Sequence, residues 1–116
     1  MPTANLTLIL LSVMMICVGQ LLFKLVGLRL QAGISALDIR VAGFGILAMA
    51  IYAAATLIWI YVLRTTPLTK AYPYMAISFV IVPVASIWLY SEQVRPQYVA
   101  GAALIVLGVI LIGSSK

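Results

Sequence analysis

Four long apolar stretches, separated by short polar segments, make up almost the whole chain. Each reaches or approaches the roughly 20 residues that a helix needs to cross a bilayer. The predicted spans are residues 6–26, 41–63, 71–90 and 99–113. Because nothing remains for a separate soluble domain, we predict a single all-α domain over residues 1–116, a bundle of four transmembrane helices.

The last two spans carry small and helix-breaking residues. Pro73 and Pro83 each remove a backbone donor, which lipid cannot replace, so they predict an inward-facing helix braced by its neighbours or, alternatively, a simply kinked one. In the fourth span Gly101 and Gly108 lie two turns apart. Their spacing predicts close helix packing, either in a dimer seam or within the chain's own bundle.

Composition supports an integral membrane protein. The chain is 66% hydrophobic and 8% charged, with a mean hydropathy of +1.24, and a soluble fold of 116 residues cannot bury so much apolar surface. The net charge of +5 is scattered between the spans, which argues against nucleic acid as a partner. With no histidine and one cysteine, Cys17, we expect neither a metal site, a cofactor nor an internal disulfide.

The basic residues do not fix the orientation of the chain. Four spans place both termini on one side, with three basic residues there and four on the other, so the positive-inside rule barely decides. We expect a partner to set the orientation, or insertion in both directions. The two groups are Arg64, Lys70 and Lys116, and Lys24, Arg29, Arg40 and Arg95.

The first span is not purely apolar, because it contains Gln20 and Lys24. They lie four residues apart and therefore share one helix face, which Val13 and Ile16 continue. Lys24 is near the end of the span, where a lysine can also serve as a snorkelling anchor. Gln20 lies one turn deeper, and its amide needs a partner, which favours a binding role.

Aromatic residues follow the second span at helical spacing. Tyr52, Thr56 and Trp59 lie at i, i+4 and i+7 and predict a groove lining. Trp59 and Tyr61 are better explained by an interfacial aromatic belt, which leaves Tyr52 as the groove candidate.

The turns carry the remaining candidates. Pro67 sets a short turn, after which Lys70 and Tyr72 begin the third helix, where free N–H groups favour a phosphate. A solvated basic loop is the alternative. In the last loop, a simple interpretation of Glu92 and Arg95 is an exposed ion pair of little energetic value. Pro96 fits the first turn of the fourth helix.

Three separated motifs resemble the four-helix form of the drug/metabolite transporter superfamily. They are GQLLFK (residues 19–24), PLTKAYP (67–73) and the acid followed by a glycine-rich helix over 90–114, which is similar to the EamA domain. The small multidrug resistance family within it implies an antiparallel dimer and an acid midway along the first helix. Here Ile16 occupies that position and Met75 replaces a family tryptophan, which argues against drug/proton antiport.

The chain is more similar to the subunits of the 4-amino-4-deoxy-arabinose phosphoundecaprenol flippase. That resemblance implies transport of a polyprenyl-phosphate aminosugar across the bacterial inner membrane for lipid A modification, by a homodimer or a pair of related subunits. We hypothesise that Lys24 and Lys70, with Arg64, hold the lipid phosphate. Gln20, Tyr72, Tyr52 and Glu92 are further substrate-binding candidates.

Two other functions stay open at this point. A proton-coupled exporter of cationic compounds would need a carboxylate, for which Glu92 is the candidate. A non-transporting subunit of an envelope-synthesis complex is the second. An enzyme is not expected, because no acid/base pair or activated nucleophile is visible in the spans.

Overall fold

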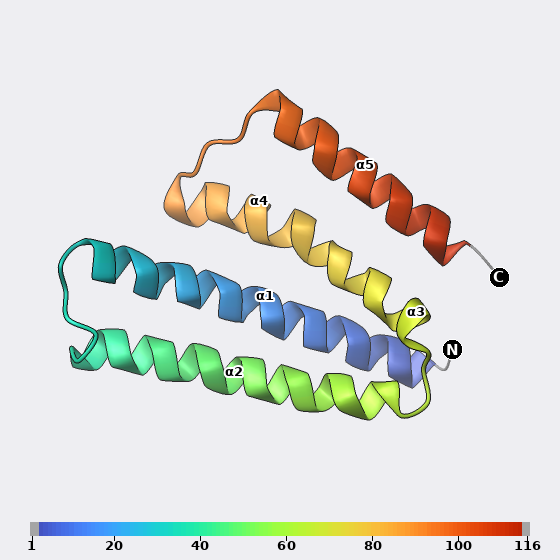
Figure 1. Ribbon diagram of the computed structural model, residues 1–116, viewed down its shortest axis with the longest axis horizontal. Coiled ribbons are helices and arrows are strands. Elements are labelled where there is room, and N and C mark those ends of the chain that lie inside the picture. Colours follow the sequence, from blue (N-terminus) through green and yellow to red (C-terminus); the bar gives the residue numbers. More distant parts are fainter. Residues whose placement is uncertain (1–2, 115–116) are drawn as a thin grey trace.

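The described part of the chain is built from helices and the short segments that connect them (Figure 1). The structure is a computed structural model that describes residues 3–114. Four helical stretches are long and apolar enough to span a bilayer, which confirms the predicted all-α class. The elements are α1 (Thr3–Gln31), α2 (Ile39–Leu63), α3 (Leu68–Ala71), the 3₁₀ helix η1 (Tyr72–Ile77), α4 (Ser78–Tyr90) and α5 (Pro96–Gly113).

The first two helices form a tight antiparallel pair. α1 runs five residues further than expected, so the first loop shrinks to residues 32–38. Gly33 turns the chain there at a φ of +89°, which favours glycine. Asp38 then caps α2 by accepting a 3.0 Å hydrogen bond from the backbone N–H of Arg40.

Small and polar residues bring α1 and α2 together. The hydroxyl of Ser12 donates to the carbonyl of Ala55 at 2.8 Å, and Gly19 faces the carbonyl of Ala48. Asn5 donates from its amide to two threonine hydroxyls after α2. A buried apolar cluster lies beside these contacts and joins both helices to α3: Ile9, Val13, Cys17, Val62 and Ala71.

The third span is not one continuous α-helix. Pro67 precedes α3, which has only four residues, and the chain then tightens into η1 around Pro73. Proline has no N–H for the i−4 bond, which accounts for the change of helix type. Pro83 lies inside α4. η1 and α4 both pack against α1, but Ser86 is the one buried residue of α4 and η1 has none, so the inward-facing helix stays a prediction.

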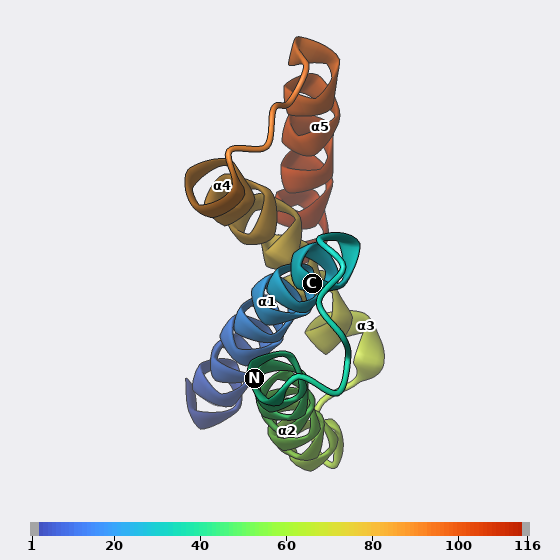
Figure 2. The same cartoon turned by 90° about the vertical axis from the view of Figure 1, so that its left-hand side faces the viewer.

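The helices lie in an open row rather than a closed cylinder. Figures 1 and 2 show the order α2, α1, α4, α5, and the chain extends 51 × 36 × 16 Å along its principal axes. α5 packs on η1 at one end and diverges from α4 toward the other.

The last helix has no buried residue along its described length. A Cβ added at Gly101 or Gly108 would meet nothing within 4 Å. Packing inside the same chain therefore does not explain these glycines, and that alternative is wrong. A dimer seam on this helix stays a prediction.

Candidate functional site

Charged side chains gather at the two ends of the helix row. One end, formed by the α1–α2 and α4–α5 loops, carries four basic residues and both acids, as predicted. The other end carries Arg64 and Lys70. Lys116, expected on that side, lies outside the described residues.

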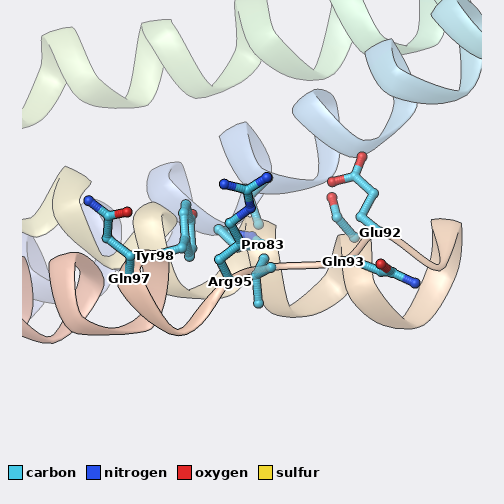
Figure 3. Close-up of a pocket in the computed structure, with 9 residues that line it drawn as sticks. Pro83, Glu92, Gln93, Arg95, Gln97 and Tyr98 are labelled. Carbon is cyan, nitrogen blue, oxygen red and sulfur yellow. The ribbon is translucent and has the colours of Figure 1, made fainter.

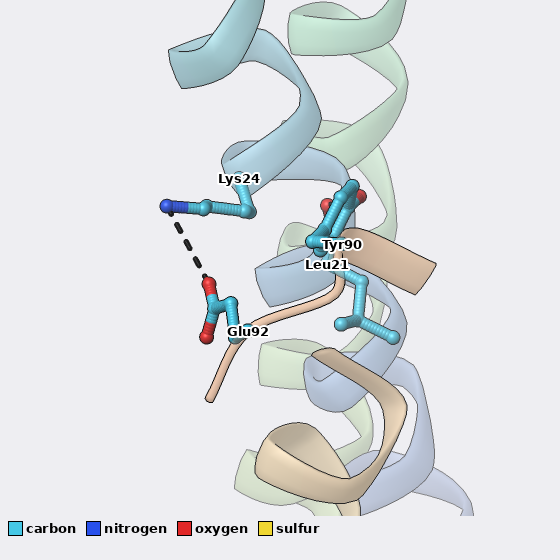
Figure 4. A network of polar contacts seen from close by, with 4 residues as sticks. All are labelled: Leu21, Lys24, Tyr90 and Glu92. Atoms are coloured by element: carbon cyan, nitrogen blue, oxygen red, sulfur yellow. Dashed lines mark hydrogen bonds and ion pairs between the residues drawn. The ribbon is translucent and has the colours of Figure 1, made fainter. Parts of the chain in front are cut away.

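Lys24 and Glu92 meet at the first of these ends (Figure 4). The Nζ of Lys24 lies 3.5 Å from Oε1 of Glu92, and both side chains are a little under half exposed. Next to them the hydroxyl of Tyr90 donates to the carbonyl of Leu21 at 2.6 Å. Leu21 and Lys24 lie one turn apart on α1, so two contacts tie the end of α4 to the same stretch of helix.

The turn that delivers Glu92 begins at a left-handed residue. Ser91 ends α4 with φ +54° and ψ +32°. A left-handed residue ends the helix and redirects the chain, and Glu92 then lies beside Lys24 of α1. The expected pair between Glu92 and Arg95 is wrong, because Lys24 is the ion-pair partner of Glu92 in the described chain.

Lys70 and Tyr72 lie at the opposite end. Lys70 lines a pocket of about 290 Å³ between the third span and the last turn of α5, together with Thr69, Tyr74 and Gly113. Tyr72 is exposed and borders an adjoining apolar pocket.

The anion site expected at the helix start is not formed by Lys70. The helix begins at Leu68, and the backbone N–H of Lys70 is already bonded to the carbonyl of Pro67 at 3.0 Å. Arg64 also turns away: its guanidinium stacks 4.0 Å from the ring centre of Tyr61, and its Nε donates to the Tyr61 carbonyl.

Lys24 and Lys70 do not converge within one chain. Lys24 meets the loop before α5, whereas Lys70 lies beside Gly113 at the far end of that helix. An 18-residue helix is about 27 Å long, so one phosphate cannot touch both lysines. The hypothesis that both lysines hold the same phosphate within one chain is therefore wrong, and a phosphate-binding role for each lysine alone stays a prediction.

Gln20 and Tyr52 share a groove on the outer face of α1 and α2, with Phe23 and Met49. Tyr52 also packs against Phe23, with ring centroids 6.5 Å apart. Tyr52 therefore lines a groove, and its role in binding a substrate stays a prediction.

The other two members of that predicted set have local roles. Thr56 donates to the carbonyl of Tyr52, one turn earlier. Trp59 is partly buried against the core cluster and Tyr61 is exposed, and their place in an interfacial aromatic belt stays a prediction.

A crevice of about 580 Å³ opens where α4 and α5 diverge (Figure 3). Val82 and Pro83 give it an apolar wall, and the loop and the start of α5 give it a polar rim. Of the rim residues, only Glu92 was a predicted site residue. The missed ones are Gln93, Arg95, Gln97 and Tyr98, and their only signal was a run of polar residues around a proline.

The model of the EamA-like transporter family matches residues 2–114. The chain belongs to the EamA-like transporter family. This confirms the resemblance seen in its three motifs.

Several relatives of this EamA-like chain are named probable 4-amino-4-deoxy-L-arabinose-phosphoundecaprenol flippase subunit ArnE. The protein from Enterobacter sp. is 31% identical over 85% of this chain and 87% of its own length. Those from Salmonella paratyphi B and Salmonella newport are 41% identical over 60% of this chain and 62% of theirs. No solved structure matches the chain.

The family and the four spans together indicate the cellular location of the chain. A member of a transporter family with four helices that can cross a bilayer is a multi-pass protein of the inner membrane. Its polar side chains at the two ends of the row therefore lie near the two faces of that membrane.

Proposed function

We propose that the chain is a flippase subunit that moves a polyprenyl-phosphate-linked aminosugar across the bacterial inner membrane, for lipid A or another envelope glycan. The observation that carries this proposal is the 31% identity to a relative with that printed function, over 87% of the relative's length.

The charge distribution supports an anionic head group. Both acids of the chain lie in loops, and α1 carries Ile16, not an acid, midway along its length. Cations lie at each end of the row, with Lys24 on one side and Lys70 on the other. A cationic substrate would find no carboxylate within the spans.

The two lysines form two phosphate-binding sites, called stations below, one for each leaflet of the membrane. Lysine is a flexible point charge, which suits a phosphate that must later leave. Gln20 and Tyr52 hydrogen-bond the head group near the Lys24 station, and Tyr72 does so near the Lys70 station. Arg64 adds positive potential there although its side chain stacks on Tyr61.

The route between the stations follows the third span. Pro73 and Pro83 interrupt its regular hydrogen bonding, and the α4–α5 opening begins beside Pro83. The head group crosses along this irregular backbone while the polyprenyl tail stays in lipid. Backbone of this kind is tolerated at membrane depth where it lines a polar path.

The chain works with a second four-helix subunit, either a copy of itself or a relative. The word subunit in the relatives' printed name and the uncovered α5 support this.

Transport by variants tests the proposal. In inner-membrane vesicles, Lys24→Ala and Lys70→Ala should each lower transport of a polyprenyl-phosphate aminosugar at least about tenfold, the effect of losing about 1.4 kcal/mol. Lys24→Arg should keep part of the activity. Arg40→Gln, which removes an exposed charge from the first turn of α2 at the same end of the row, is the control. Normal rates in both alanine variants and in their combination would refute the proposal.

The cationic-drug exporter makes an opposite prediction. It requires proton-coupled efflux that disappears in Glu92→Gln. We expect no such efflux, because Glu92 lies in the α4–α5 loop and is paired with Lys24.

A further inference from the structure

The α4–α5 crevice holds two opposite charges that do not neutralise each other. Glu92 and Arg95 both line it, and Figure 3 shows their charged ends projecting to the same side of the loop. Their closest charged atoms are not within 4.0 Å, since no ion pair joins them in the described residues. The crevice therefore offers separate positive and negative sites.

Arg95 lacks an acidic partner within residues 3–114. The chain has two acids. Asp38 is engaged at the cap of α2, in the other loop, and Glu92 is paired with Lys24. Of the nearby cations, Arg29 is stacked 5.3 Å from the ring centre of Phe44. The guanidinium of Arg95 is therefore the positive group in the crevice that is available to bind an anion from outside the chain.

The start of α5 favours the same charge. Arg95 is the residue before the helix, Pro96 has no N–H, and both Tyr98 and Val99 bond the Arg95 carbonyl. The N–H of Gln97 donates to no backbone carbonyl in the described chain. An anion beside Arg95 would meet this N–H and the positive end of an 18-residue helix.

Glu92 is held by a contact that another ammonium can replace. The Lys24–Glu92 distance is 3.5 Å and both side chains are partly solvated, so the pair is a weak surface ion pair. A primary ammonium on a ligand has the same chemistry as the lysine head. Exchange of one for the other costs little and frees Lys24 to approach a phosphate.

We propose that this crevice recognises a zwitterionic head group. Arg95 and the backbone N–H of Gln97 bind the phosphate, and Glu92 binds the sugar ammonium in place of Lys24. This inference rests on the proposed function and adds to it the residues that distinguish an aminosugar from a neutral sugar. Val82 and Pro83 form the apolar wall against which the first isoprene units lie.

Lipid competition on the full chain in mild detergent tests the inference by native mass spectrometry. The probes are a polyprenyl-phosphate aminosugar, the same lipid with its amine formylated, and phosphatidylglycerol. Wild-type protein should prefer the free amine about tenfold over the formylated lipid. Glu92→Gln should lose this preference but still bind both polyprenyl lipids better than phosphatidylglycerol.

Arg95→Gln should behave differently. It should weaken both polyprenyl lipids by a similar factor, about fivefold or more, and retain the preference for the amine. Arg40→Gln is the matched control and should match wild type. An unchanged preference in Glu92→Gln, or an Arg95→Gln protein no weaker than Arg40→Gln, overturns the inference and leaves the flippase proposal intact. Wild-type protein that binds all three lipids equally overturns both.

Discussion

The side chain of Asn5 links the start of α1 to the turn that follows α2 through hydrogen bonds. Its amide donates to the hydroxyls of Thr65 and Thr66 at 2.8 and 2.9 Å, and Thr66 is buried. Asn5→Ala leaves these hydroxyls without their donor, so we expect a loss of about 1–3 kcal/mol in unfolding free energy.

Thermal or denaturant unfolding in detergent measures this effect. Thr7→Ala is the control, because the Thr7 hydroxyl bonds only to the carbonyl of Thr3 on an exposed face. Equal stability of the two variants would show that the Asn5 contacts do not hold the helix ends together.

Ser91 is the strained residue beside the candidate site. A residue with a Cβ at φ +54° costs about 1 kcal/mol relative to glycine, and a β-branched residue costs more. We expect Ser91→Gly to keep or raise stability and Ser91→Val to lower it by about 1–2 kcal/mol, measured by thermal unfolding. A more stable Ser91→Val protein would contradict the left-handed turn.

The individual charges were easier to predict than their partners. Lys24 and Glu92 both stand out in the sequence because charges in this chain are rare. Their pairing does not, since 68 positions separate them and Arg95 is closer along the chain. The link depends on the left-handed turn at Ser91, for which glycine or asparagine is the usual signal.

At the level of elements, α1 and α2 pack through small residues seven positions apart. Asn5, Ser12 and Gly19 on α1 are buried. On α2 the buried positions have the same spacing: Val41, Ala48, Ala55 and Val62. Heptad spacing keeps one seam in contact along two nearly antiparallel helices, and small residues allow close approach.

This seam predicts the effect of a larger side chain. Ala48 is fully buried against Gly19, so Ala48→Leu should destabilise the chain by about 1–3 kcal/mol through overpacking. Ala50→Leu, two residues away on an exposed face, should be nearly neutral. Unfolding of both proteins in the same detergent measures the difference, and similar stabilities would contradict the seam.

Helix existence was predictable and helix type was not. The four apolar stretches gave all four spans, and Pro96 begins α5 as expected. The hydrophobic pattern could not reveal that residues 72–77 form a 3₁₀ helix, because apolarity is continuous through Pro73. Proline indicated a break in hydrogen bonding without specifying its form.

The glycines of α5 predict a contact with a second subunit. Because a Cβ at Gly108 meets nothing in the chain, Gly108→Leu should leave the monomer fold intact and reduce the dimer fraction severalfold. Gly43→Leu on α2, where a Cβ also meets nothing, is the matched control. Native mass spectrometry reads the subunit count, and an unchanged dimer in Gly108→Leu would place the seam elsewhere.

At the scale of the whole molecule, the chain is a row of helices with its functional groups at both ends. Its thickness of 16 Å along the shortest axis is not much more than one helix. Such a row leaves both broad faces of α4 and α5 open, and an enclosed path for a polar head group would require a second subunit.

Some features of the candidate site were predictable from the sequence, and others depend on the arrangement of the helices in this open row. Charges at the ends and the absence of an acid in the first span were readable from residue positions alone. The separation of Lys24 from Lys70 and the crevice between α4 and α5 depend on how the helices splay, which local patterns do not encode.

Native mass spectrometry of the full chain, extracted from inner membranes in mild detergent, tests the central proposal most directly. The proposal predicts an assembly of two four-helix chains that retains one polyprenyl-phosphate aminosugar lipid against an excess of phosphatidylglycerol. A monomer that carries only bulk phospholipids and releases the polyprenyl lipid as readily as phosphatidylglycerol would contradict it.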